Sequence, residues 1–323
     1  MIFDKKNARF LSMLGHRGTF SIIMAELAEQ MDDLIVMTAD MGYLTGLDRF
    51  KKKYPTQFYN VGIAEQNMIG IASGLAKCGH TVFATTYANF ITMRSYEQIR
   101  LNLGYMKLNV KVVGTGGGVS MGMSGNSHYG LEDIALMRAI PNMMVISPAD
   151  GIEIAKTMIA VAKYEGPVYI RLSGELNQPI VYRNDYEFEL GKAITLKEGS
   201  DLTIIGTGTM VYECLKAAGI LEEQGISVRV VNMHTIKPLD TQVIEKAIKE
   251  TKLIVTVEEH SIVGGLGSAV ADYKSTVGTM VPQLKVGLPD EFGIVGDYKY
   301  LLEHYGLTAK QIAQSVKEMY KTL

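Results

Sequence analysis

The chain has 323 residues and a formal net charge of −2, with 47% hydrophobic and 20% charged residues. That length predicts two globular domains, and the balanced charge excludes the basic surface of a protein that binds nucleic acids or anionic membranes. The two cysteines, Cys78 and Cys214, lie far apart with no Cys-x-x-Cys spacing, so we expect neither a disulfide framework nor a cysteine metal cluster, and a reducing cytoplasm is the expected compartment.

Short runs rich in valine and isoleucine alternate along the chain with segments of helical periodicity. This alternation predicts βαβ units, in which helices cover both faces of a parallel sheet. The first series has strands at 34–39, 81–85, 109–114, 143–147 and 167–172, with helices at 63–78, 88–103 and 150–164. A second series has strands at 201–206, 227–232 and 252–257, each followed by a helical segment. We therefore predict an α/β protein with two three-layer α/β/α domains, at residues 1–187 and 188–323.

Two segments of the first domain have unusual composition. The helix predicted at 63–78 carries small residues around much of its circumference and has no clear polar face, which indicates a central position or an oligomer interface. The stretch 112–131 has no formal charge, but its seven glycines exclude a lipid-facing helix, so we expect a neutral, functional loop. The first residues lack the apolar core of a signal peptide, and no membrane element is predicted.

Glu65 lies in the first turn of the helix predicted at 63–78, and none of its sequence neighbours from Asn60 to Met68 is cationic. A carboxylate at this position complements the helix dipole. One without a cationic partner could instead share a proton with a ligand nitrogen. The residue chemistry alone leaves both roles open.

Four further side chains have two possible roles each. Tyr87, Phe90 and Met93 form an apolar stripe at helical spacing, which belongs either to the core or to the wall of a site for a flat heterocycle. His128, in the uncharged stretch, is either a hydrogen-bonded structural residue or an acid/base group.

Metal and nucleotide signals are weak. The six histidines are scattered, with no His-Glu-x-x-His pair, so no metal site is predicted on this chain. A P-loop is absent, and the Gly-x-Gly run that begins at Gly114 precedes its helix by about sixteen residues, too many for the tight phosphate turn of a nicotinamide-binding oxidoreductase.

Several segments together resemble the C-terminal half of transketolase, in the form of the stand-alone subunit of a split transketolase. The most specific is FYNVGIAEQNMIGIASGLA (58–76), which is similar to the pyrimidine-domain signature of thiamine diphosphate enzymes. Further matches at 84–90, 127–150, 166–172 and 257–272 extend the resemblance over essentially the whole chain. It implies a pyrimidine-binding domain, a transketolase C-terminal domain, and transfer of a two-carbon ketol unit from a ketose to an aldose.

The resemblance also implies a partner. Family enzymes hold the cofactor diphosphate through a metal-binding Gly-Asp-Gly…Asn motif, and this sequence contains no Gly-Asp-Gly. The expected cofactors are thiamine diphosphate and Mg²⁺, with the metal ligands on an N-terminal transketolase subunit. An α2β2 assembly is the expected oligomer.

Residue by residue, the resemblance assigns five positions to the cofactor. Glu65 matches the glutamate that hydrogen-bonds N1′ of the aminopyrimidine, and Asp40 matches an aspartate that contacts the cofactor. Tyr87 and Phe90 match the aromatic pocket around the pyrimidine, where Met93 replaces an aromatic residue.

The substrate side matches less well. Arg17 matches an arginine that grips the distal anionic group of the substrate, and His128 matches a histidine that handles substrate hydroxyl protons. Where the family has a histidine in the glycine loop, an aspartate that reads the C2 hydroxyl and a second phosphate-gripping arginine, this chain has Gly116, Ser124 and Gly174. Because losing such contacts changes what a hydrogen-bonding site accepts, the hypothesis is a modified substrate: a sulfonated, deoxy or nucleotide-linked sugar.

Three alternatives are kept beside this interpretation. They are a 1-deoxyxylulose-5-phosphate-synthase-like subunit, a 2-oxo acid dehydrogenase E1 β-like subunit, and a non-catalytic structural subunit. The segment SHYGLEDIALMR (127–138), with His128, argues against the dehydrogenase. The retained Glu65, Tyr87 and Phe90 argue against a subunit without activity.

Overall fold

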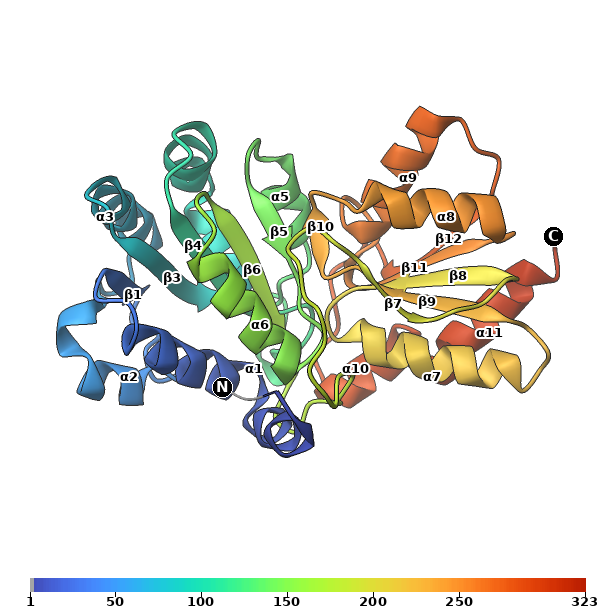
Figure 1. Ribbon diagram of the computed structural model, residues 1–323, viewed down its shortest axis with the longest axis horizontal. Coiled ribbons are helices and arrows are strands. Elements are labelled where there is room, and N and C mark those ends of the chain that lie inside the picture. Colours follow the sequence, from blue (N-terminus) through green and yellow to red (C-terminus); the bar gives the residue numbers. More distant parts are fainter. Residues whose placement is uncertain (1–2) are drawn as a thin grey trace.

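The computed structural model describes residues 3–323. Figure 1 shows two lobes side by side, each a β-sheet between layers of helices. The predicted α/β class, with two domains of three layers, is confirmed. None of the described helices is long and apolar enough to cross a lipid bilayer.

The first lobe contains a seven-stranded sheet in the order β10-β5-β6-β4-β3-β1-β2. All its neighbouring strands are parallel except the pair β10 and β5. Its strands are β1 (Leu34–Thr38), β2 (Phe58–Asn60), β3 (Thr81–Tyr87), β4 (Val110–Gly117), β5 (Met144–Ile146), β6 (Val168–Ser173) and β10 (Thr235–Lys237). The five strands predicted for this domain are all present, because each is a run of buried β-branched or aliphatic residues.

Helices cover both faces of this sheet. The longest, α1 (Lys5–Ala28), packs with α6 (Gly151–Ala162) on one face, while α3 (Glu65–Lys77) and α5 (Asp133–Ala139) contribute to the core of the other. The remaining helical segments are α2 (Asp48–Lys53), η1 (Pro55–Gln57), the π-helix η2 (Phe90–Arg94), α4 (Tyr96–Gln98), the π-helix η3 (Ile99–Tyr105) and η4 (Gly122–Ser124). The segment predicted as a helix at 88–103 is therefore helical, but most of it has the wider turns of a π-helix and not those of an α-helix.

Helix α3 is not central, which corrects one of the two positions considered for it. It buries Met68, Ile69 and Ala72 against the sheet, while Ile71 on its other side is 38% exposed. A side chain added at Gly70 would meet nothing within 4 Å, so this face of the helix is open. The second position, an oligomer interface, remains a prediction.

The second lobe contains a five-stranded sheet in the order β12-β11-β8-β9-β7. In Figure 1, α8 and α9 cover one face of this sheet and α7 and α11 cover the other. Its elements are β7 (Ile194–Lys197), β8 (Leu202–Gly206), α7 (Met210–Glu222), β9 (Val228–Asn232), α8 (Thr241–Glu250), β11 (Ile254–Ser261), α9 (Leu266–Val277), β12 (Gln283–Leu288), α10 (Tyr298–His304) and α11 (Ala309–Tyr320). Only β7 runs antiparallel to its neighbour.

The second half of the chain also contributes to the first sheet. Strand β10 follows β9, yet it pairs antiparallel with β5 through Thr235 and Ile146. Three residues are too few for a recognisable periodicity, so the sequence pattern did not predict this strand. Consequently the two halves share backbone hydrogen bonds as well as side-chain packing.

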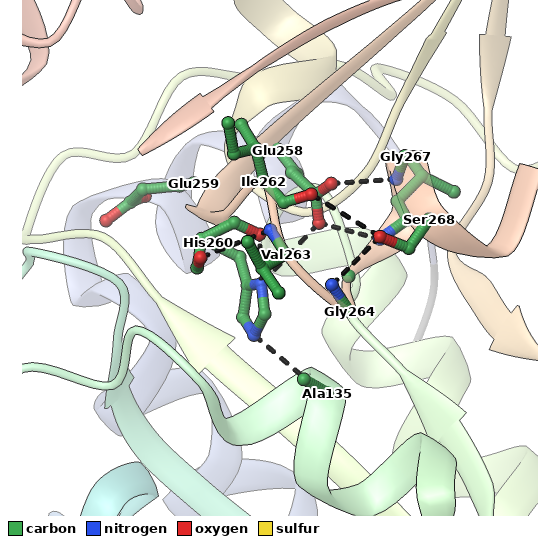
Figure 2. Close-up of polar contacts among 12 residues, drawn as sticks. Ala135, Glu258, Glu259, His260, Ile262, Val263, Gly264, Gly267 and Ser268 are labelled. Atoms are coloured by element: carbon green, nitrogen blue, oxygen red, sulfur yellow. Dashed lines mark hydrogen bonds and ion pairs between the residues drawn. The ribbon is translucent and has the colours of Figure 1, made fainter. Parts of the chain in front are cut away.

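The segment around β11 joins the lobes through buried polar groups, which Figure 2 shows. Glu258 accepts hydrogen bonds from the backbone amides of Leu266 (2.7 Å) and Gly267 (2.8 Å), so it caps the N-terminus of α9. His260 accepts one from the amide of Ala135 in α5, at 3.4 Å. Both residues lie in the segment 257–272 that resembles the family. Glu258 thus stabilises α9 of the second lobe, and His260 contacts α5 of the first lobe.

His234, beside β10, gives a prediction about pH. Its side chain is fully buried, one ring nitrogen lies 2.9 Å from the Thr235 hydroxyl, and burial lowers the pKa of the imidazole from 6.5 to about 4. Below the unfolded pKa the unfolded chain binds a proton that the folded chain refuses, so this residue destabilises the fold as pH falls. Between about pH 7.5 and pH 5, the wild type should lose about 2 kcal/mol more stability than His234→Leu.

Urea unfolding of both proteins across this pH range measures the difference. If the difference in the free energy of unfolding between the wild type and His234→Leu stays constant with pH, then His234 accepts a proton in the folded state as readily as in the unfolded state.

Candidate active site

The candidate site lies at the carboxyl ends of the parallel strands of the first sheet, where ligands bind in open α/β sheets. Tyr87 is the last residue of β3, and Asp40 follows β1. Strand β4 runs on to Gly117, three residues beyond the end of the strand predicted at 109–114. It leads into the glycine loop, residues 118–130. The sequence therefore brings its candidate residues to one edge of the sheet.

Three aromatic rings form the centre of the site. His128 lies 5.8 Å from Tyr87 and 5.4 Å from Phe90 between ring centroids, and Tyr87 lies 5.5 Å from Phe90. The buried Asn89 donates a hydrogen bond to the carbonyl of Ser127 (2.7 Å), which holds the loop against the strand end. The Ser127 hydroxyl lies 2.9 Å from Nδ1 of His128 and fixes the orientation of its ring.

Glu65 is the first residue of α3, and its side chain is 7% exposed. Contrary to the expectation from its sequence neighbours, it has a cationic partner: Nη1 of Arg94 donates to its Oε1 at 2.7 Å. The partner is 29 residues away in sequence, so a search of the adjoining residues could not find it. Glu65 is a paired carboxylate that faces the aromatic cluster.

Arg94 also contacts the aromatic cluster. Its guanidinium carbon lies 3.7 Å from the centroid of the Phe90 ring, well within the range of a cation–π contact. The two residues are four positions apart in the π-helix η2, and this spacing is the one sequence signal for their contact. The guanidinium thus lies on the ring of Phe90 and against the carboxylate of Glu65.

Arg17 reaches the opposite side of the cluster. Helix α1 is interrupted at Gly15 (φ +65°), where a side chain would approach the carbonyl of Glu175 to 2.7 Å. The helix resumes with His16 and Arg17, and the Arg17 guanidinium lies 5.7 Å from the Tyr87 ring centroid. Arg17 Nη2 also lies 3.4 Å from Sδ of Met121.

A cavity of about 250 Å³ opens beside Arg17. It is lined by residues of the α1 interruption and of the segment after β6: Leu14, Gly15, His16, Arg17, Ser120, Gly174, Glu175 and Leu176. Burial lowers the pKa of His16 to about 3, so this histidine stays neutral at the edge of the cavity. Arg17 is therefore the only cationic side chain among the residues that line it.

The glycine loop is closed on itself and fixed to the second lobe. The backbones of Gly118 and Gly130 exchange two hydrogen bonds, of 2.9 and 3.0 Å. Beyond that pair, the Val119 amide donates to Glu259 of β11 at 2.9 Å. Gly118 has φ +68°, and a Cβ there would lie 2.1 Å from the Glu259 carboxylate, so glycine is required at this position. The C-terminal domain thereby holds the loop that carries His128.

Three predicted residues lie outside these contacts. Asp40 is exposed and accepts a hydrogen bond from Asn60 (3.2 Å), while Met93 is 43% exposed. Ser124 is exposed in the loop, where its carbonyl accepts from the Ser127 hydroxyl at 3.4 Å. Their proposed contacts require a cofactor, a substrate or another chain.

Comparison with known proteins identifies the family. Residues 13–178 match the transketolase pyrimidine binding domain, and residues 191–312 match the transketolase C-terminal domain. The chain belongs to the transketolase family.

Two relatives that match over nearly their whole length are named as transketolase subunits. The chain is 42% identical to one subunit of the apulose-4-phosphate transketolase of Phocaeicola vulgatus, over 96% of this chain and 99% of that protein. It is 40% identical to the 6-deoxy-6-sulfo-D-fructose transketolase subunit SqwH of a Clostridium species, over 94% of each. A solved structure described as a split gene transketolase, inactive beta4 tetramer, superposes with a TM-score of 0.85 at 40% identity, covering 95% of this chain and 98% of that chain.

Two of the positions at which this chain departs from the transketolase pattern are fixed by its backbone. Gly116 has φ +69°, and a Cβ there would lie 2.7 Å from Sδ of Met121. Gly174 has φ +89°, and a Cβ would lie 2.6 Å from Nε2 of Gln178. Larger side chains would be strained at both positions. The histidine and arginine expected from the family pattern would therefore need a different local backbone here, and exchanging the side chain alone would not restore them.

The residues present fit a thiamine pyrimidine ring. The site already holds a flat group with N–H donors, the Arg94 guanidinium, between an aromatic face and a buried carboxylate. An aminopyrimidine has the same shape and the same need for these two surfaces. Ligands for the Mg²⁺ expected with the cofactor are a separate matter. Within residues 3–323, no group of three or more histidine, cysteine, aspartate or glutamate side chains is placed to hold an ion.

Proposed function

We propose that this chain is the C-terminal subunit of a two-subunit, thiamine-diphosphate-dependent transketolase that transfers a two-carbon ketol unit from a ketose to an aldose. The observation that carries the proposal is the pairing of Glu65 with the Phe90 ring, which together present a buried carboxylate and an aromatic face to one flat N–H donor. Thiamine diphosphate, when bound, supplies the nucleophile and the electron sink of the reaction.

The protein side chains bind and orient the cofactor. Glu65 shares a proton with the pyrimidine N1′, and its buried carboxyl group, already hydrogen-bonded to an N–H donor in this structure, holds that proton between the two groups. Tyr87 and Phe90 form the walls of the ring site, and Met93 lines its outer edge. Asp40, beside Asn60 at the end of β1, contacts the cofactor from the neighbouring strand.

The remaining site residues handle the substrate. His128 holds or moves a proton at a substrate hydroxyl, since its ring lies against Tyr87 and Phe90 and is oriented by Ser127. Arg17 binds the anionic end of the sugar in the cavity between α1 and the segment after β6. Ser124 contributes a hydroxyl to the same substrate from the glycine loop.

The diphosphate and Mg²⁺ are held by a second, N-terminal subunit, in an α2β2 assembly. Supporting this, apolar side chains are exposed on α3 and in the residues before it, with Ile63 77%, Ile71 38% and Tyr59 43% exposed. The similar split transketolase described as a beta4 tetramer is inactive, as expected for an enzyme that lacks the other subunit. A cytoplasmic location is part of the proposal, because Cys78 and Cys214 are both free.

The substrate is a modified sugar. The cavity beside Arg17 has one cationic side chain, and the acidic residue Glu175 also lines it, an arrangement that disfavours a phosphate dianion. The named relatives act on apulose 4-phosphate and on 6-deoxy-6-sulfo-D-fructose. A singly charged sulfonate, or a phosphate at another position of the sugar, is consistent with this cavity.

Co-expression with a subunit that carries a Gly-Asp-Gly motif tests the proposal. We expect ketol transfer only when both chains, thiamine diphosphate and Mg²⁺ are present, and faster transfer with a sulfonated or deoxy ketose than with xylulose 5-phosphate. Full turnover by this chain alone would contradict the two-subunit claim. Preference for xylulose 5-phosphate would contradict the substrate claim.

A further inference from the structure

Arg94 contacts two of the residues proposed to bind the pyrimidine, Glu65 and Phe90. Its Nη1 donates to Glu65 at 2.7 Å, and its guanidinium carbon lies 3.7 Å from the centroid of Phe90. Arg94 thus occupies Oε1 of the carboxylate and one face of the ring, the two surfaces on which a pyrimidine would lie.

The side chain is placed to move without disturbing the core. Arg94 is 47% exposed, whereas Glu65 is 7% exposed. The backbone carbonyl of Arg94 accepts a hydrogen bond from the Gln66 side chain at 3.1 Å, which ties η2 to α3 independently of the guanidinium. Rotation of the Arg94 side chain alone therefore clears Glu65 and Phe90 together.

The contact also meets a need of the cofactor-free chain. Glu65 is buried at the start of α3, and a buried carboxylate without a partner is costly. Arg94 supplies that partner until another N–H donor takes its place. Since π-turns inside helices are frequent at functional sites, the position of Arg94 in η2 is consistent with such a task.

We propose that Arg94 is an internal occupant of the pyrimidine site, which the cofactor must displace, and that it thereby sets the affinity for thiamine diphosphate. This inference rests on the proposed function, in which Glu65 and Phe90 bind the pyrimidine. It makes Arg94 a competitor of the cofactor and not one of the residues that grip it. The cofactor-free subunit is thus held in a state in which Glu65 is paired and its pyrimidine site is occupied.

The experiment is a calorimetric titration of thiamine diphosphate, with excess Mg²⁺, into the assembled two-subunit complex. The variants are Arg94→Met, which removes the charge and keeps the length, and Arg94→Lys, which keeps the charge without the flat, forked donor group. Arg100→Met is the matched control, because Arg100 is exposed in the adjoining segment η3. Size-exclusion chromatography of each variant with the partner establishes that assembly is intact.

We expect Arg94→Met to lower the dissociation constant of thiamine diphosphate roughly three- to thirty-fold, since an ion pair and a cation–π contact no longer have to be broken. Arg94→Lys should fall between Arg94→Met and the wild type, and Arg100→Met should match the wild type. In the chain without its partner, Arg94→Met should lower the thermal midpoint, because Glu65 is left buried without a cation.

Equal or weaker binding of thiamine diphosphate by Arg94→Met would overturn the inference and would leave the proposed function standing. If neither the wild-type complex nor the Arg94→Met complex bound thiamine diphosphate, the proposed function itself would be wrong.

Discussion

Replacing Glu65 with glutamine is expected to lower the turnover of the assembled enzyme by about 10²–10⁴-fold, the range for loss of a general acid–base group. Glutamine keeps the shape of the side chain and can still hydrogen-bond a pyrimidine, but it cannot give a proton to N1′ or take one back. The effect should therefore be on kcat more than on the binding of the cofactor. Steady-state kinetics with the preferred ketose, at saturating thiamine diphosphate and Mg²⁺, measures it.

The same variant should fold and assemble normally. The partner of Glu65 is a half-exposed arginine, and ion pairs of that kind contribute about 1 kcal/mol or less. Glu97→Gln is the matched control, since Glu97 is an exposed carboxylate in α4, the next helical segment after η2. Turnover of Glu65→Gln at the wild-type rate would leave Glu65 as a residue that only complements the dipole of α3.

The sequence pattern was a good guide to the interior of the two sheets. Strands such as β1 and β8 are buried along their whole length and read as continuous aliphatic runs, so their residues alone define them. Strands β7 and β12 were missed because they lie at sheet edges and are half-buried, which leaves their hydrophobic pattern weak. Strand β10 was missed because three residues are too few for a recognisable periodicity, and its partner, β5, lies about 90 residues earlier in the chain.

The candidate site could also be predicted only in part, because some of its contacts join elements that are far apart in the sequence. Tyr87, Phe90 and His128 were named from sequence, and they do lie together, because strand ends and the following loop meet at one edge of a parallel sheet. The pairing of Arg94 with Glu65 could not be predicted, since it depends on how η2 packs against α3. Sequence neighbours give the local charge only, whereas a charge partner can come from any element that the fold places nearby.

The sequence pattern also did not predict the junction between the lobes, which contains a fully buried ion pair between an arginine and an aspartate. Arg171 of β6 and Asp133 of α5 are 2% and 0% exposed, with 2.8 Å between Nε and Oδ2. Arg171 also donates to the carbonyls of Gly130 (3.0 Å) and Glu259 (2.8 Å). One side chain therefore connects the first sheet, the end of the glycine loop and β11 of the second lobe.

Replacing Arg171 with methionine should lower the free energy of unfolding by about 3–5 kcal/mol, because the change leaves the Asp133 carboxylate buried without a counter-charge and removes the hydrogen bonds from Arg171 to the carbonyls of Gly130 and Glu259. Arg229→Met is the matched control: Arg229 is 5% exposed at its side chain, but its partners Glu198 and Glu250 are 64% and 48% exposed and can be solvated when it is lost. We expect a cost of about 1–2 kcal/mol for the control. Urea unfolding measured by circular dichroism gives both values.

The Arg171 change should also separate the unfolding of the lobes. In the wild type, the contacts of Arg171 across the junction couple the two sheets, so a single transition is expected. Without them the second lobe, with its own sheet and core, should unfold in a transition distinct from that of the first. A loss no larger than that of Arg229→Met, with one transition retained, would mean that strand β10 and the apolar contacts hold the lobes together and that the buried ion pair does not.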